Sequence, residues 1–150
     1  MSKWRRTASL RARLGYEDRF LKAPTDRKYS KTHEWYLVNG DVVTMGITQH
    51  AADELTDITY IELPDVGATI GAGDSIGEVE SVKATSEIFA AVGGAVLAVN
   101  EALSDQPELV NDDAFGDGWL VKLQASAPEV LTALMDANQY KAFVENAEQS

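Results

Sequence analysis

Residues 66–100 read VGATIGAGDSIGEVESVKATSEIFAAVGGAVLAVN, and this stretch decides the fold of the chain. Glycines separate short runs that contain valine, isoleucine and threonine, a punctuation typical of short strands joined by sharp corners and not of helices. The glycines are Gly67, Gly71, Gly73, Gly77, Gly93 and Gly94. The stretch therefore predicts a compact, mainly β domain built as a barrel or a sandwich.

Lys83 lies inside this stretch, between the strand-like residues 76–80 and 88–92. The pattern places it near the bend of a hairpin. An exposed ε-amine on a flexible four-carbon stem, projecting from a rigid β scaffold, is a good site for enzymatic amide formation, which removes the charge. Position alone does not distinguish such an attachment site from an ordinary solvated turn lysine.

Upstream, residues 35–45 predict a β-hairpin. Asn39-Gly40 forms its turn, because this dipeptide tolerates the positive φ angles of a tight primed turn. Thr48 then serves as the N-cap of a short helix over residues 49–55.

Downstream, we predict a strand at residues 58–63, ended by Pro64, and a last strand at residues 118–123. Residues 126–129 (SAPE) read as a capping box at a helix start, and residues 136–139 (DANQ) repeat the signal. Two short C-terminal helices follow from these signals. Their inward-facing residues are predicted to be Val130, Leu131, Leu134, Tyr140, Phe143 and Val144.

The composition excludes several classes of function. The chain has 150 residues, 45% of them apolar, which suffices for one domain with a core. It contains no cysteine, which excludes disulfides, thiolate metal sites and thiol catalysis. His33 and His50 show no recognisable metal-ligand spacing, so we expect no metal. The longest apolar stretch, residues 89–99, is too short for the roughly 20 residues of a membrane helix.

Charge is unevenly distributed along the chain. Residues 1–22 contain seven of the 13 lysines and arginines and two of the 24 acids, which leaves six bases and 22 acids elsewhere. Such an acidic body repels phosphate backbones, so we expect no binding to nucleic acid. The basic start is compatible with a mitochondrial transit peptide, a disordered tail or a start codon assigned too far upstream.

Seven blocks of sequence, in order over about residues 26–146, resemble the H protein of the glycine cleavage system. The blocks are Lys28-Tyr29 with Thr32-His33-Glu34-Trp35, Gly46-Ile47-Thr48, Ile61-Glu62-Leu63-Pro64-Asp65-Val66-Gly67, Glu80-Ser81-Val82-Lys83-Ala84-Thr85-Ser86, Val99-Asn100-Glu101, Pro107-Glu108-Leu109-Val110-Asn111 and Gly118-Trp119-Leu120. The resemblance implies a barrel-sandwich hybrid, like that of lipoyl and biotinyl domains, with short helices of which two are C-terminal. It divides the chain into a basic, disordered extension (1–25), a lipoyl-carrier domain (26–146) and a tail (147–150).

By this resemblance, Lys83 carries lipoate in amide linkage. Glu80, three residues earlier, and Gly94, eleven residues later, match the positions at which the family is recognised by its lipoylating enzyme. A biotinyl carrier normally has methionines beside its lysine, whereas the neighbours here are Val82 and Ala84. The expected cofactor is therefore lipoate and not biotin.

The resemblance also implies a cleft in which the loaded arm folds back onto the carrier between transfers. Glu34 with Thr32, and also Glu87, match the family's positions there, and carboxylates would stabilise the cationic amine of the arm. Thr32 and Glu87 stand where serine and aspartate are often found. Without the resemblance, Glu34 and Glu87 read as surface acids, and His33 and Trp35 as packing residues.

The implied function is that of a non-catalytic carrier. A pyridoxal-phosphate glycine decarboxylase (P protein) transfers the aminomethyl group to the lipoyl arm, an aminomethyltransferase (T protein) passes the carbon to tetrahydrofolate, and dihydrolipoamide dehydrogenase (L protein) reoxidises the arm. Two other roles stay open: a relay that donates lipoyl groups to 2-oxoacid dehydrogenases, and an unlipoylated protein-interaction module. We expect a monomer in the bacterial cytoplasm, or in the mitochondrial matrix if residues 1–22 are a transit peptide.

The chain departs from the family's pattern at two places. Residues 90–94 read AAVGG where many relatives have APVSG, which should make this segment slightly less rigid. Residues 55–57 read LTD where LGD is common. Neither departure touches Lys83 in the sequence.

Overall fold

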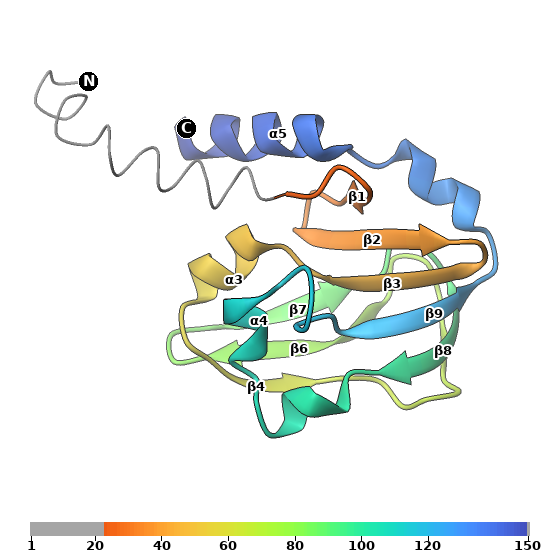
Figure 1. The fold of residues 1–150 in the computed structure, drawn as a ribbon, viewed down its shortest axis with the longest axis horizontal. Coiled ribbons are helices and arrows are strands. Elements are labelled where there is room, and N and C mark those ends of the chain that lie inside the picture. Colours follow the sequence, from red (N-terminus) through yellow and green to blue (C-terminus); the bar gives the residue numbers. More distant parts are fainter. Residues whose placement is uncertain (1–22, 150) are drawn as a thin grey trace, which may run out of the picture.

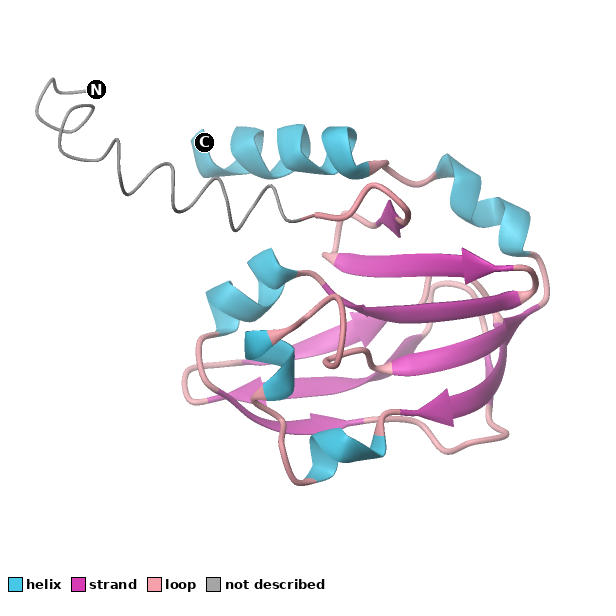
Figure 2. Ribbon diagram, viewed as in Figure 1, coloured by secondary structure: helices cyan, strands magenta, loops and turns pink. Residues whose placement is uncertain are grey.

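The computed structural model describes residues 23–149, so the basic segment of residues 1–22 and its alternative readings lie outside the described residues. Within the described part, nine strands form two antiparallel sheets that face each other (Figures 1 and 2). The strands are β1 (Lys28–Tyr29), β2 (Glu34–Asn39), β3 (Val42–Ile47), β4 (Ile58–Glu62), β5 (Thr69–Ile70), β6 (Ser75–Ser81), β7 (Thr85–Phe89), β8 (Gly94–Val99) and β9 (Val121–Ala125). The helical segments are α3 (Gln49–Leu55), η1 (Glu101–Ser104), α4 (Leu109–Asp112), η2 (Pro128–Ala133) and α5 (Ala137–Gln149), where η marks a 3-10 helix.

One sheet has six strands in the order β1-β2-β3-β9-β8-β5, and the other has three in the order β4-β6-β7. Alternation along the strands explains the layering. In β9, for example, Val121, Leu123 and Ala125 are buried while Lys122 and Gln124 are exposed. The inner faces of both sheets contribute to a single apolar core, so the predicted mainly β barrel-sandwich is confirmed.

The β2–β3 hairpin forms as predicted, but its turn lies one residue later. Asn39 pairs with Val42, which leaves Gly40 and Asp41 as the two turn residues. Gly40 alone of the two has a positive φ, 65°, the pattern of a type II′ turn. Asn39 therefore belongs to the strand and not to the turn.

The C-terminal segment confirms one of the two predicted capping boxes. The first is wrong: Ser126 donates its hydroxyl proton to Gly93 O at 3.2 Å, and η2 starts at Pro128 without a side-chain cap. The second forms, since Gln139 N donates to Asp136 Oδ1 at 2.8 Å and Asp136 N to Gln139 Oε1 at 2.9 Å. It starts α5, which packs over β1 (Figure 1).

A second apolar cluster joins α5 to the outer side of β1 and β2. Tyr140 of α5 stacks on Tyr29 with ring centroids 4.8 Å apart, and Ala23 and Trp35 are buried in the same cluster. Gly46 is the cross-strand neighbour of Trp35, and a Cβ there would lie 2.8 Å from the indole. Glycine in the Gly46-Ile47-Thr48 block is thus explained by the room that Trp35 needs.

Most of the predicted inward-facing residues of the C-terminal helices are confirmed. Leu131, Tyr140 and Val144 are buried, and Leu134 and Phe143 pack in part against the two clusters. The prediction that Val130 faces inward is wrong, because its side chain is 45% exposed. The 3-10 geometry of η2, with three residues per turn, turns Val130 away from the face that buries Leu131.

Candidate functional site

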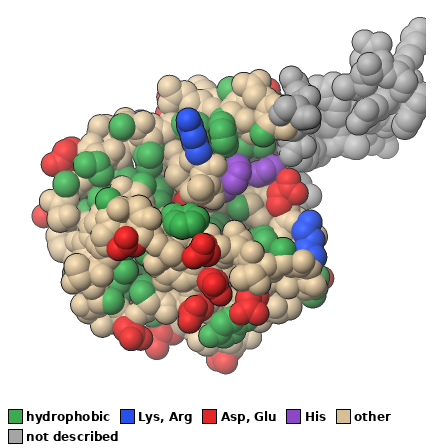
Figure 3. All heavy atoms as spheres, turned by 180° about the vertical axis from the view of Figure 1, so that it is seen from behind, with side chains coloured by type: hydrophobic (Ala, Val, Ile, Leu, Met, Phe, Trp, Pro, Cys, Tyr) green, Lys and Arg blue, Asp and Glu red, His purple; other side chains and the backbone are tan. Residues whose placement is uncertain are grey.

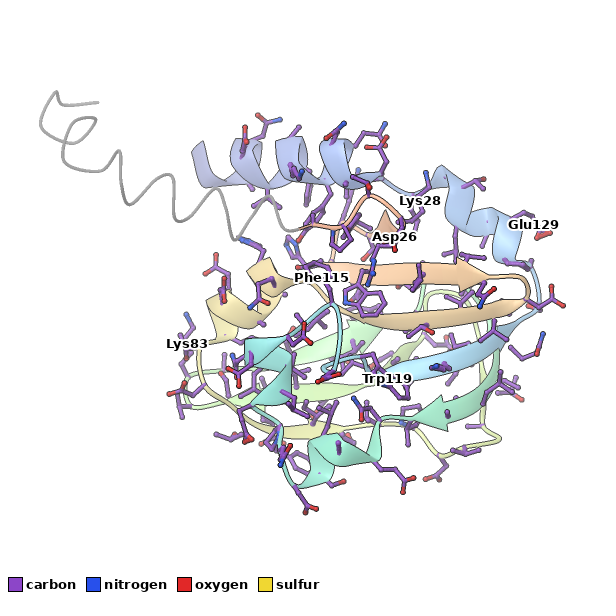
Figure 4. All side chains as sticks on the ribbon, in the orientation of Figure 1. Asp26, Lys28, Lys83, Phe115, Trp119 and Glu129 are labelled. Atoms are coloured by element: carbon purple, nitrogen blue, oxygen red, sulfur yellow. The ribbon has the colours of Figure 1, made fainter. Side chains whose placement is uncertain are left out.

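The connection between β6 and β7 is a turn of Val82, Lys83 and Ala84 at one end of the molecule (Figure 4). All three residues are exposed. Ser81 shapes the turn: its Oγ accepts from Lys83 N at 3.3 Å and from Ala84 N at 3.1 Å, while its own N–H donates to Ala84 O at 2.8 Å. The predicted hairpin position of Lys83 is confirmed, with a hydrogen-bonded backbone and an exposed side chain.

The turn also rests on the segment that joins α3 to β4. Val82 N donates to Asp57 O at 3.1 Å, and Ser81 pairs with Ile58 at the start of β4. Thr56, which stands where relatives often have glycine, immediately precedes this contact. The second departure from the family's pattern is therefore remote from Lys83 in sequence and adjacent to its turn in space.

Glu80 and Gly94 lie in different sheets. Glu80 is half-buried on β6, between Tyr60 of β4 and Thr85 of β7. Gly94 lies on β8, where a Cβ would meet Gln124 O at 2.1 Å. Close packing of β8 on β9 is thus sufficient reason for glycine at position 94, and recognition by a lipoylating enzyme stays a prediction for both residues.

Glu34 is not the surface acid that one reading predicted, because it is 1% exposed. Ser30 donates its hydroxyl proton to Glu34 Oε1 at 2.6 Å, Thr32 donates to the same oxygen, and Phe89 N donates to Oε2 at 3.1 Å. Burial raises the pKa of Glu34, and these donors oppose the rise. Together with the Tyr36 hydroxyl, which donates to Phe89 O at 2.9 Å, the carboxyl group ties β2 to the end of β7.

Glu87 is exposed on β7, two residues before the Phe89 amide that Glu34 accepts. Its cross-strand neighbour is Glu78, which in turn faces Glu62. Three carboxylates thus form a row on one face of the three-stranded sheet, and like charges so placed repel each other. Acidic side chains are also scattered over much of the face in Figure 3. Glu34 and Thr32 are joined by a hydrogen bond. Glu87 is connected to them only through β7, the strand whose Phe89 amide bonds Glu34.

Sequence reasoning did not find the polar contacts of His33. Its Nδ1 lies 2.8 Å from the hydroxyl of Tyr140, which lies 2.8 Å from Thr48 Oγ1. The ring of His33 is 5.1 Å from that of His50. Burial, and then the nearby His50, lower the pKa of His33 from 6.5 to about 4. His33 thus helps to attach α5 to the β core, as a packing residue.

Asn111 of α4 is a second residue that sequence reasoning gave no role. Its Nδ2 donates to Thr56 O at 2.6 Å and to Ala52 O at 3.3 Å, and its Oδ1 accepts from Ile58 N at 3.0 Å. These partners lie 53 to 59 residues away in the chain, so no local pattern could have indicated them. The side chain explains the asparagine of the Pro107–Asn111 block.

Residues 23–149 contain neither a metal-ligand cluster nor a membrane-spanning helix. This part of the chain has no group of three or more histidine, aspartate or glutamate side chains able to hold a metal. No helix in it is long and apolar enough to cross a membrane. A cavity of about 490 Å³ between β2 and η2 has Lys28 and Glu129 in its lining, at the other end of the molecule from Lys83 (Figure 4).

Comparison with known proteins agrees with this geometry. Residues 27–147 match the family model described as glycine cleavage H-protein. The chain belongs to the glycine cleavage H-protein family. The glycine cleavage system H protein of Anaeromyxobacter sp. (strain K) is 47% identical over 128 residues, which are 85% of this chain and 100% of that protein. The H protein of Enterobacter sp. (strain 638) is 50% identical over 124 residues, 82% of this chain and 96% of that one.

A solved H protein shares the fold. The crystal structure of the glycine cleavage system H protein from Mycobacterium marinum superposes with a TM-score of 0.73 at 38% identity, over 79% of this chain and 96% of that one. Members of the H-protein family are non-catalytic lipoyl carriers of the glycine cleavage system, so this chain is a carrier component and not an enzyme.

Proposed function

We propose that lipoate is attached in amide linkage to Lys83. In this function the chain carries the aminomethyl group of glycine from the glycine decarboxylase to the aminomethyltransferase, and dihydrolipoamide dehydrogenase then reoxidises the arm. The observation that carries the proposal is the exposed lysine at the tip of a hydrogen-bonded hairpin turn, in a chain of the H-protein family.

The residues present fit such a group. Ser81 fixes the backbone on both sides of Lys83 while the four-carbon side chain stays free, which suits an arm that must reach several partners. The lipoyl group supplies a disulfide that accepts two electrons and holds the transferred carbon. The chain contains no cysteine, so no thiol of its own can exchange with that disulfide.

We also propose that Glu34, Thr32 and Glu87 receive the loaded arm. The carboxyl group of Glu34 is buried, and its Oε1 already accepts two hydroxyl protons. Its Oε2 accepts the Phe89 amide, and a cationic amine could bond this oxygen as well or compete with Ser30 and Thr32 for Oε1, since a charge-assisted bond is the stronger one. Glu87 is exposed on β7, so it could meet the amine at the surface.

For recognition by the lipoylating enzyme, we propose Glu80 and Gly94. Glu80 precedes the turn on the same strand, so an enzyme that surrounds Lys83 could contact its partly exposed carboxylate. Changing Glu80 to glutamine should slow lipoylation without lowering the unfolding temperature; a full modification rate in this variant would remove Glu80 from the recognition site.

Intact mass tests the attachment site. The chain is expressed with lipoate and a lipoylating enzyme, and its mass should increase by one lipoyl group. Lys83→Arg should abolish the increase, whereas Lys31→Arg, at another exposed lysine, should leave it unchanged. An unmodified native chain, or modification that persists in Lys83→Arg, would overturn the proposal.

Reconstitution tests the carrier role. With decarboxylase, aminomethyltransferase, dihydrolipoamide dehydrogenase, tetrahydrofolate and NAD, the lipoylated chain should support glycine-dependent formation of NADH. Transfer of lipoyl groups to a 2-oxoacid dehydrogenase without any glycine oxidation would indicate the relay role instead. We propose that the protein is a monomer. We also place it in the bacterial cytoplasm, which the bacterial sources of its relatives support.

A further inference from the structure

The junction between α3 and β4 has a strained backbone. Thr56 has φ 62° and ψ −141°, a region that β-branched residues rarely adopt. Such a conformation persists only where the surrounding structure holds it. The neighbouring Asp57 is the residue whose carbonyl oxygen accepts the Val82 amide of the lysine turn.

One side chain holds this junction on both sides of Asp57. Asn111 Nδ2 donates to Thr56 O at 2.6 Å, and Asn111 Oδ1 accepts from Ile58 N at 3.0 Å. Nδ2 reaches back to Ala52 O in α3 at 3.3 Å. The amide therefore fixes the peptide groups that flank Asp57, and with them the direction of the Asp57 carbonyl.

That carbonyl gives the lysine turn itself a contact with the body, beyond the pairing of β6 with β4. The bonds of Ser81 shape the turn but lie within the hairpin, and the pairing of β6 with β4 ends at Ser81 and Ile58, before the turn. Val82 N donates to Asp57 O at 3.1 Å and thereby joins the turn to the junction. Figure 4 shows Lys83 beside the segment that leaves α3.

We propose that Asn111 is a positioning residue for Lys83. It acts through Thr56, Asp57 and Val82, and it holds the attachment turn in the one geometry that a modifying enzyme or a transfer partner meets. Without Asn111, Thr56 relaxes toward an unstrained φ, the Asp57 carbonyl turns, and the turn loses its hydrogen bond to the junction while β6 stays paired with β4. The relevance to lipoyl transfer rests on the proposed function, but the mechanical linkage does not.

A nitroxide attached at position 83 tests the linkage. Because the chain has no cysteine, Lys83→Cys provides a single labelling site. Adding Asn111→Ala should sharpen the electron paramagnetic resonance lines as the turn gains mobility. The matched control is Asn100→Ala, since Asn100 Nδ2 also donates to two carbonyl groups, those of Asp117 and Trp119, at 2.7 and 2.8 Å.

The control should destabilise the protein without changing the spectrum at position 83. An unchanged spectrum in Asn111→Ala, or equal sharpening in both variants, would overturn the proposal. Neither labelled variant contains Lys83, so the spin-label experiment tests the linkage even if the native chain is never lipoylated.

Hydrogen exchange of the full native chain provides a second measurement. The Val82 amide should be protected, and Asn111→Ala should accelerate its exchange about tenfold, as expected for loss of one or two hydrogen bonds. If Asn111→Ala does not fold, the native chain still decides: exchange of Val82 at the rate of a free amide would refute the linkage. In lipoylation kinetics, Asn111→Ala should raise the KM for the carrier and leave kcat unchanged, whereas a fall in kcat alone would count against positioning.

Discussion

Replacing Thr56 by glycine should stabilise this protein, although it removes a side chain. A non-glycine residue in this backbone region costs about 1–3 kcal/mol, and glycine loses about 0.5–1 kcal/mol more backbone entropy on folding. The substitution also removes the exposed hydrogen bond from Thr56 Oγ1 to Leu55 O, which contributes little because water replaces it. The expected net gain in the free energy of unfolding is about 1 kcal/mol.

Urea unfolding, followed by tryptophan fluorescence, measures this gain. With a slope of about 1–3 kcal/mol per molar urea, 1 kcal/mol raises the midpoint by roughly 0.3–1 M. Thr56→Ala is the control: alanine meets nearly the same penalty at positive φ, so its free energy of unfolding should change by less than about 0.5 kcal/mol. A glycine variant no more stable than the native chain, or an alanine variant equally stabilised, would refute the strain at Thr56.

Three further changes test other parts of the fold. Burial raises the pKa of Glu34, so the contribution of this carboxyl group to stability is largest below pH 4.5 and is lost as pH rises through the raised pKa. Glu34→Gln should remove this decline in the free energy of unfolding, measured by urea melts at several pH values. The pKa of His33 is lowered to about 4, so stability is lost as pH falls from about 6.5 to 4, and thermal melts of His33→Gln should show a flatter pH dependence. Gly46→Ala places a Cβ 2.8 Å from the Trp35 indole and should lower the free energy of unfolding, measured in urea, by about 1–3 kcal/mol. The control Gly71→Ala should change this free energy less, because its Cβ would meet only the flexible Asp74 side chain.

The strands were predictable because their signals are local. Alternating β-branched residues and glycine punctuation indicated where strands lie along the chain, and Thr48 was correctly read as a cap, since it accepts from Ala51 N at 3.1 Å. The errors arose where a distant partner competed with a local one. Ser126 belongs to a reasonable capping box, but its hydroxyl bonds Gly93 O, 33 residues away, and the helix begins without it. Sequence spacing carries no information about such a competitor.

The candidate site divides in the same way. The hairpin position of Lys83 follows from the strands on either side, so it could be read from neighbouring residues. The burial of Glu34 could not, because it involves residues far along the chain, such as Phe89, 55 residues away, whose backbone amide donates to the carboxyl group. The sequence marked Asn111 only as part of a family block. Its hydrogen bonds to the α3–β4 junction are seen only in the structure, where α4 packs against α3.

An attachment lysine must satisfy two opposing requirements, a mobile side chain and a fixed origin. In this chain the two are separated: the four-carbon side chain of Lys83 is in solvent, while Ser81 shapes its backbone locally and Asp57 holds it from outside. The bonds of Ser81 move with the turn, and the pairing of β6 with β4 ends at Ser81, so the turn beyond it takes its outside support from Asp57. Threonine at position 56 makes the outside support depend on Asn111, since glycine would adopt the same φ without strain and would need less holding. One of the two places at which this chain departs from the family's pattern is thus the place at which, in our proposal, the position of Lys83 depends on one amide side chain.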